Sequence, residues 1–199
     1  MLYLHKESIK ARLFMKKIVF VCHGNICRSP MAEFVMKKLV KDAGREKEFE
    51  IESMAVSGEE WGNPIYPPAK AKMREHGIPF GDHRAHRITP QEFAAADLVV
   101  IMDESNRRLL NRIVGGALGT PSSNPKDPQN ANTGFSEFRK SVAGGKGVTG
   151  NGLNTNCKVI KMMEFAGQDR DVADPWYTGD FESTYRDIYT ACRALLAIL

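Results

Sequence analysis

One short segment brings together the side chains that nucleophilic chemistry on phosphorus requires. It reads CHGNICRSP from Cys22 to Pro30 and directly follows the apolar run 18–21. A thiolate is a strong nucleophile, and the planar fork of an arginine six positions later can hold two oxygens of one phosphate. Ser29 can donate its hydroxyl to the sulfur and steady the negative charge. The segment therefore predicts a nucleophilic Cys22 that attacks phosphorus and an Arg28 that binds the phosphate.

The elements on either side of this segment predict a cradle for an anion. Residues 18–21 are apolar and mostly β-branched, which is typical of a buried parallel strand, and residues 30–40 have a helical period. Pro30 suits the first turn of that helix. A loop between a strand and a helix N-terminus offers free backbone N–H groups and the positive end of the helix, and phosphate is the natural ligand.

The loop positions themselves are candidate ligand contacts. Gly24 and Asn25 tolerate the positive φ angles that turn backbone amides inward. The inward amides, the helix dipole and Arg28 all favour the thiolate form of Cys22. We expect the other loop positions to line the binding site, and these are His23, Gly24, Asn25, Ile26, Cys27 and Ser29.

Two other interpretations of the cysteines are weighed against this one. A single cysteine is often a buried apolar residue, and Cys22, His23 and Cys27 could form part of a metal site. No set of paired ligands at zinc spacing occurs elsewhere in the sequence, and the strand–loop–helix context favours the nucleophile. We therefore expect neither a metal nor a cofactor.

The remainder of the chain alternates strands and helices. We expect further strands at 49–56, 97–102 and 158–165, and further helices at 68–76, 104–113 and 180–196, the last of which Asp180 is expected to cap. This alternation predicts an α/β fold with an open four-stranded parallel sheet and helices on both faces, a flavodoxin-like three-layer arrangement. We place it in one domain over residues 15–199.

Two segments differ from this domain in composition. Residues 1–17 carry five basic residues and one acidic residue, which accounts for the net charge of +4, and the rest of the chain is neutral overall. No nucleic-acid-binding face is expected, and residues 1–14 are interpreted as a solvated basic extension rather than a membrane anchor. More than half of residues 115–156 are Gly, Asn, Ser or Pro, which predicts a flexible insertion with at most a turn around 135–142.

The composition excludes several classes of protein. Hydrophobic residues make up 42% and charged residues 26%, as in ordinary globular domains. No apolar run approaches the roughly 20 residues of a membrane span, so no stable membrane insertion is expected. Four cysteines do not form a disulfide framework in a chain of 199 residues. We expect a reducing, cytoplasmic location and a monomer or weak dimer.

The chain resembles the low-molecular-weight protein tyrosine phosphatases. The loop CHGNICRSP and the following residues 31–33 look very like their phosphate-binding loop, and the resemblance extends over 15–113 and 157–199. Further motifs match in the same order, at Ser53, 62–64, 76–78, 83–85, 102–106 and 174–177. The resemblance implies the phosphotyrosine phosphatase I-like fold and metal-independent hydrolysis of phosphotyrosine or aryl phosphates through a cysteinyl-phosphate.

A phosphate monoester also needs an acid that protonates the leaving oxygen. No Asp precedes Cys22, so an aspartic acid in this role must come from downstream. Asp174-Pro175 follows the last expected strand, at the sheet edge where the cradle opens. In the resembled family the Asp of this pair is the general acid, whereas without that resemblance Asp174 would be interpreted as the start of a turn.

The resemblance implies roles for further residues. Trp176 and Tyr177 would wall the pocket and pack on an aromatic leaving group, with core packing as the alternative. Asn25, Ser53 and His83 resemble residues that brace the loop by hydrogen bonds.

The second cysteine of the loop has two compatible interpretations. A neighbouring thiol can trap an oxidised Cys22 as a reversible disulfide, and the family resemblance supports Cys27 in that role. Cys27 can equally be a small packed residue. His23 stands where the family often has an apolar residue.

Two loop-region residues bear on the substrate. Ile26 is apolar where the related protein-arginine phosphatases carry Thr, and it better suits a phosphophenyl ring. Glu59 stands where the family commonly has an aromatic wall residue, which predicts a weaker preference for acidic substrates.

Three rival functions share this sequence pattern. A thioredoxin-coupled arsenate reductase would need two closely spaced downstream cysteines, but Cys157 and Cys192 lie 35 residues apart. A protein-arginine phosphatase on the same fold and a non-catalytic module that binds phospho-ligands are the other two. The presence of Cys22, Arg28 and Asp174 together favours an enzyme.

Overall fold

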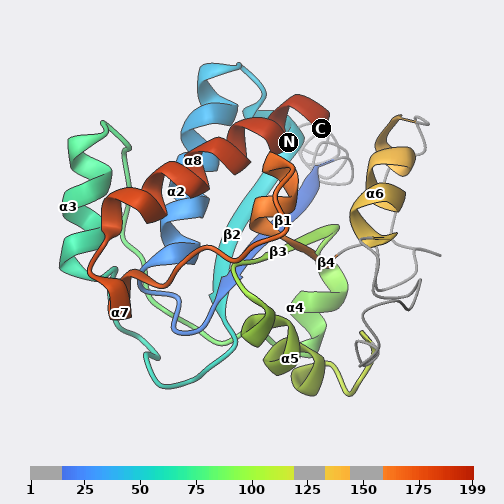
Figure 1. Ribbon diagram of the computed structural model, residues 1–199, viewed down its shortest axis with the longest axis horizontal. Helices are drawn as coiled ribbons and strands as arrows, with labels where there is room; N and C mark the ends of the chain where they lie inside the picture. Colours follow the sequence, from blue (N-terminus) through green and yellow to red (C-terminus); the bar gives the residue numbers. More distant parts are fainter. Residues whose placement is uncertain (1–14, 119–132, 144–158) are drawn as a thin grey trace, which may run out of the picture.

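A parallel sheet of four strands forms the centre of the molecule. The computed structural model describes residues 15–118, 133–143 and 159–199. The strands lie in the order β2-β1-β3-β4, and every neighbouring pair is parallel (Figure 1). This confirms the predicted open parallel sheet. The strands are β1 (Lys16–Cys22), β2 (Phe49–Ala55), β3 (Leu98–Ile101) and β4 (Val159–Lys161).

Helices cover both faces of the sheet, as the apolar strands require. Side chains alternate along β1, so Ile18, Phe20 and Cys22 join one core cluster while Val19 and Val21 join the other. The first cluster contains residues of α2 (Arg28–Asp42), α3 (Pro67–Glu75) and α8 (Phe181–Ile198). The second contains residues of α4 (Pro90–Ala95) and α5 (Glu104–Ile113). Cys22 therefore ends β1 on the side of the sheet that α2 covers (Figure 1).

The last strand is shorter than the prediction over 158–165. It ends at Lys161, and residues Met162–Ala166 form the 3₁₀ helix η3, which Gly167 closes with a φ of 72°. Met162, Met163 and Phe165 are nevertheless buried in the core. A short apolar run has the same composition in a buried strand and a buried helical turn, so its periodicity did not distinguish them.

Part of the predicted flexible insertion is folded. Residues Thr133–Ala143 form α6, where the sequence predicted no more than a turn. Phe138 is buried, and its ring meets that of Phe165 edge-on with centroids 6.0 Å apart. Figure 1 shows α6 beside the β4 edge of the sheet. The other residues of 115–156 from 119 onward, like the extension 1–14, lie outside the described residues.

Short helices were missed where a capping residue precedes proline. Thr89 caps α4 and Asp174 caps α7 (Pro175–Thr178), and each helix has Pro at its first position. The 3₁₀ helix η1 (Glu46–Glu48) was also missed. The predicted cap of the last helix is confirmed, since Asp180 accepts a hydrogen bond from the Ser183 N–H. Within the described ranges, every helix is too short or too polar to span a membrane.

Candidate active site

The loop between β1 and α2 wraps around the sulfur of Cys22. Asn25 adopts a φ of 59°, in the left-handed region, and its backbone N–H donates to Cys22 Sγ at 3.3 Å. Gly24 does not take a positive φ, contrary to the expectation for this position. Its small size matters for another reason, because a Cβ there would lie 2.9 Å from Cγ of Glu60. Gly24 thus permits the close approach of the neighbouring loop.

A chain of hydrogen bonds runs behind the loop and reaches Cys22. Asn25 Nδ2 donates to both Ser29 Oγ, at 3.0 Å, and Ser53 Oγ, at 2.9 Å. Ser53 in turn donates to Glu33 Oε2 at 2.6 Å, while Ser29 Oγ lies 3.0 Å from Cys22 Sγ. The four residues that this chain of hydrogen bonds links to Cys22 are all buried, and these are Asn25, Ser29, Ser53 and Glu33. At one end of the chain Glu33 accepts from Ser53, and at the other end either Ser29 or Cys22 can donate, since Ser29 Oγ also lies 3.4 Å from the Met54 carbonyl.

Residues outside the loop also hold Asn25 in its left-handed conformation. His83 Nε2 donates to the backbone carbonyl of Asn25 at 2.8 Å, and Asn25 Oδ1 accepts from the His86 N–H at 3.3 Å. Burial lowers the pKa of His83, and Nε2 carries a proton because the Asn25 carbonyl can only accept. The bracing role that the resemblance implied for Asn25, Ser53 and His83 is consistent with these contacts.

The two cysteines of the loop differ in their surroundings. Burial raises the pKa of the Cys27 thiol, and the charges of Cys22 and Asp174 raise it further. Cys27 therefore remains a neutral thiol. Cys22, Cys27 and the core residue Cys192 are all free thiols in the described part of the chain. Cys157 lies outside that part.

Arg28 is buried and bound by carboxylates on two sides. Its Nη1 donates to Asp103 Oδ2 at 2.6 Å and to the Val172 carbonyl at 3.2 Å, and its Nη2 donates to Asp174 Oδ2. Burial alone would lower the pKa of Arg28, but the charges of Cys22, Asp174 and Asp103 outweigh it and raise the pKa. The guanidinium is thus held in one orientation beside the nucleophile.

Asp103 is a functional candidate that the sequence analysis did not assign. It follows β3 at the carboxyl edge of the sheet and caps α5 by accepting from the Asn106 N–H at 2.8 Å. Burial would raise the pKa of Asp103, but hydrogen bonds from Ser105 and the charge of Arg28 lower it. Its place directly after a buried strand was a signal that could have identified it. Glu33 was also unassigned, although it is a buried carboxylate one turn after Ser29.

Asp174 stands between the guanidinium and the start of α7. Its Oδ1 accepts from the Trp176 N–H at 3.1 Å, while its Oδ2 binds Arg28. The cap and Pro175 at the first helical position fix the backbone, so the carboxyl group is directed towards the loop. The expected meeting of Cys22, Arg28 and Asp174 is therefore present.

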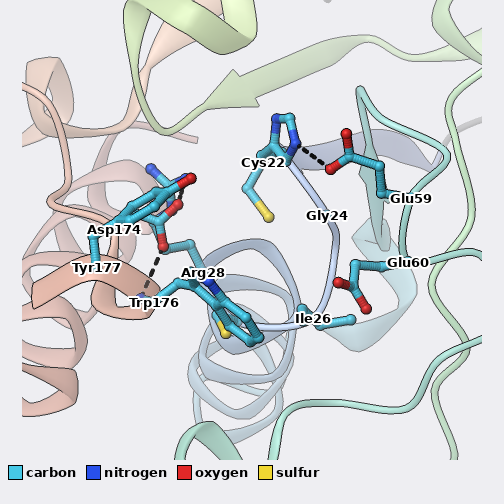
Figure 2. Close-up of a pocket in the computed structure, with 11 residues that line it drawn as sticks. Cys22, Gly24, Ile26, Arg28, Glu59, Glu60, Asp174, Trp176 and Tyr177 are labelled. Atoms are coloured by element: carbon cyan, nitrogen blue, oxygen red, sulfur yellow. Dashed lines mark hydrogen bonds and ion pairs between the residues drawn. The ribbon is translucent and has the colours of Figure 1, made fainter. Parts of the chain in front are cut away.

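These groups line a cavity of about 240 Å³. In Figure 2, Asp174 and Tyr177 lie across the loop from Glu59 and Glu60. The Trp176 ring packs on Tyr66, with centroids 4.9 Å apart, and Tyr177 is 85% exposed. The residues that line the cavity are Cys22, His23, Gly24, Ile26, Cys27, Arg28, Glu59, Glu60, Asp174, Trp176 and Tyr177. Asn25 and Ser29, expected among the ligand contacts, instead support the loop through their side chains.

The mouth of the cavity is acidic on one side. His23 Nε2 lies 3.0 Å from Glu59 Oε2, and both side chains are solvent-accessible. Glu60 accepts from Asn63 Nδ2 at 2.7 Å. Glu60 was not among the residues singled out from the sequence. Among the described residues, no cluster of three or more His, Cys, Asp or Glu side chains could hold a metal ion.

Known proteins are similar to this chain in sequence and in fold. The family model described as "Low molecular weight phosphotyrosine protein phosphatase" matches residues 17–118. The human protein of that name is 48% identical over 97 residues, which span 49% of this chain and 61% of the human protein. The pig protein is 34% identical over 185 residues, covering 91% of this chain and 94% of its own length. A solved low molecular weight protein tyrosine phosphatase from Streptococcus pyogenes superposes with a TM-score of 0.67 at 30% identity, covering 93% of each chain. This chain belongs to the low molecular weight phosphotyrosine protein phosphatase family.

Proposed function

We propose that this protein hydrolyses phosphotyrosine and other aryl phosphate monoesters through a cysteinyl-phosphate. The observation that carries the proposal is the convergence of three groups on one cavity: the wrapped sulfur of Cys22, the buried guanidinium of Arg28 and the carboxyl group of Asp174. The domain responsible would be residues 15–199, with the segment 115–156 inserted in it. The substrate class would be a phosphotyrosine-containing protein or a small aryl phosphate, and the free thiols fit the expected cytoplasmic location.

In the first step, the Cys22 thiolate attacks phosphorus in line with the leaving oxygen. Arg28 and the loop amides bind the three equatorial oxygens, where negative charge is spread in the transition state. In the proposed substrate complex Asp174 has taken up a proton from solvent. The bond between phosphorus and the aryl oxygen breaks, and Asp174 gives that proton to the oxygen. The products are a neutral phenol and a phosphorylated Cys22.

In the second step, water attacks the cysteinyl-phosphate. Asp174, now ionised, accepts a proton from the water as the oxygen bonds to phosphorus, and the sulfur leaves as a thiolate. Ser29, 3.0 Å from the sulfur, donates to the charge that returns there. Inorganic phosphate is released and the starting state of Cys22 and Asp174 is restored.

Turnover of nitrophenyl phosphate in a chelating buffer tests this proposal. We expect hydrolysis that neither a chelator nor added divalent metal changes, because Arg28 and the loop amides supply the charge stabilisation. Release of nitrophenol, followed by absorbance, measures it. Absence of turnover together with tight binding of vanadate would indicate a phospho-ligand binding module instead. Faster turnover of phosphoarginine than of phosphotyrosine peptides would favour the arginine phosphatase alternative.

The acidic side of the cavity mouth predicts a charge preference. Glu59→Gln should raise kcat/KM for a phosphotyrosine peptide with flanking Glu about two- to fivefold, since exposed charge pairs have small effects. For a peptide with flanking Lys, the same substitution should lower kcat/KM. Glu48→Gln is the matched control, because Glu48 precedes β2 at the opposite end of the strand. Equal changes for both peptides would contradict the role of Glu59.

A further inference from the structure

Lys161 is a buried charged residue that the proposed mechanism does not use. It ends β4 and pairs in register with Ile101 of β3. Only 7% of its side chain is exposed. A lysine rarely occupies such a position unless carboxylates neutralise it, because burial of an unpaired charge is costly.

Carboxylates from two segments meet the Lys161 ammonium. Its Nζ lies 2.9 Å from Asp169 Oδ1, 3.4 Å from Asp171 Oδ1 and 3.9 Å from Glu104 Oε1. Burial would lower the pKa of Lys161, but Asp169 and Asp171 outweigh it and raise the pKa. The ammonium is therefore charged, and its partners lie on segments outside its own strand.

Each of the two segments that pair with Lys161 also carries a carboxylate that binds Arg28. Asp169 and Asp171 belong to residues 167–174, here called the acid loop, which runs from η3 to α7 and ends at Asp174 (Figure 1). Glu104 directly follows Asp103, the second carboxylate on Arg28. Lys161 thus stands where the acid loop and the start of α5 approach the end of β4.

The acid loop has other inward contacts nearer the active site, since the Ala173 carbonyl accepts from Thr184 Oγ1 of α8 at 3.2 Å. Val172 is buried, its N–H donates to the Met102 carbonyl at 2.9 Å and its own carbonyl accepts from Arg28. Asp169 is 83% exposed and Asp171 is 48% exposed, so both carboxylates contact solvent while they pair with Lys161. Arg170, between them, binds Asp187 of α8 on the outer side at 2.6 Å.

We propose that Lys161 is a positioning residue that clamps the acid loop through Asp169 and Asp171 and so holds Asp174 against Arg28. The inference rests on the proposed function, since Asp174 must act as the acid there. A shift of about 1 Å in a catalytic group can cost roughly a hundredfold in rate, so a clamp three to five residues away along the loop has a measurable effect.

Lys161→Met removes the ammonium and keeps an apolar stem of similar length. We expect kcat for phenyl phosphate to fall about tenfold, because a poor leaving group needs a well-placed acid. For dinitrophenyl phosphate, whose leaving group needs little protonation, we expect less than about a twofold change. KM should stay within about twofold for both, since Cys22 and Arg28 still bind the phosphate.

Three variants separate positioning from general destabilisation. Lys161→Arg should restore most of the phenyl phosphate rate, because it keeps the charge. Lys72→Met is the matched control: Lys72 also bridges two carboxylates, Glu75 and Glu182, but away from the acid loop. Where Lys161→Met fails to fold, the double variant Asp169→Asn/Asp171→Asn tests the same contact from the exposed loop and should show the same leaving-group pattern.

The decisive measurement is the effect of Lys161→Met in an Asp174→Asn background. If Lys161 acts through Asp174, the second substitution should lower the phenyl phosphate rate by less than about twofold. An undiminished tenfold loss in that background, or equal losses on both substrates in the single variant, would overturn the inference. If Asp174→Asn itself slows both substrates equally, the proposed acid is wrong. If that variant discriminates between the substrates and Lys161→Met does not, only the clamp is wrong.

Discussion

Cys22→Ser should reduce turnover of nitrophenyl phosphate by at least about 10⁴-fold, the scale seen when a nucleophile is removed from a catalytic unit. The serine hydroxyl is far harder to ionise than a thiol. The backbone N–H of Asn25 and the hydroxyl of Ser29 lie 3.3 and 3.0 Å from the sulfur, where they can stabilise the thiolate that the proposed mechanism uses. Steady-state rates for purified protein measure the loss directly.

Binding should survive this substitution. Arg28 keeps its contacts with Asp103 and Asp174, and the backbone of the loop is unchanged, so inorganic phosphate should bind within about fivefold of the wild-type affinity. Cys192→Ala is the control, since Cys192 is a fully buried thiol in the core and should leave turnover intact. Residual turnover in Cys22→Ser above about one per cent of wild type would exclude a thiolate mechanism.

Asp174→Asn should slow hydrolysis of phenyl phosphate by about 10²- to 10³-fold and that of dinitrophenyl phosphate by less than about tenfold. The amide cannot give a proton to the leaving phenolate. Its oxygen can still accept from the Trp176 N–H, so the cap of α7 and the loop geometry should be kept. A plot of log kcat against leaving-group pKa should therefore become steeper in the variant.

The same substitution at another helix-capping aspartate serves as the control for the acid role of Asp174. Asp180→Asn alters the cap of α8, where Asp180 accepts from Ser183 in an exposed position, and should leave the leaving-group dependence unchanged. Equal slowing of both esters by Asp174→Asn would show that Asp174 serves to orient Arg28 rather than to donate a proton. Thermal unfolding of each variant controls for loss of folded protein.

The sheet and the nucleophile loop could be predicted because their signals are local. Apolar, β-branched runs marked β1 and β3, and a phosphate-type loop needs its nucleophile, its arginine and its turn residue within one segment. The prediction that Asp180 caps the last helix was confirmed for the same reason, because the Ser183 N–H that it binds is only three residues away. The error at Gly24 has the opposite origin, since its constraint is Glu60, which lies 36 residues away.

The missed elements depend on partners remote in sequence. The helix at 133–143 lies in a segment rich in Gly, Asn and Ser, and the burial of Phe138 against Phe165 compensates for that composition. Residues 162–166 are apolar because they fill the core, and the same run suits a strand or a 3₁₀ turn. A short stretch of sequence therefore determines neither the helix at 133–143 nor the 3₁₀ helix at 162–166.

The amino-acid order alone sufficed for the type of fold and for the loop that carries the proposed nucleophile and the proposed phosphate-binding arginine. These follow from periodicity and from spacing within a single loop, where covalent connection already brings the groups together. Folding in three dimensions was needed to bring Asp103 and Asp174 onto opposite sides of Arg28, to connect Glu33 with Cys22 through two serines and an asparagine, and to bury Lys161 beneath the acid loop. The longest of these pairings joins residues 146 positions apart, and the type of a charged side chain does not indicate which partner will neutralise it.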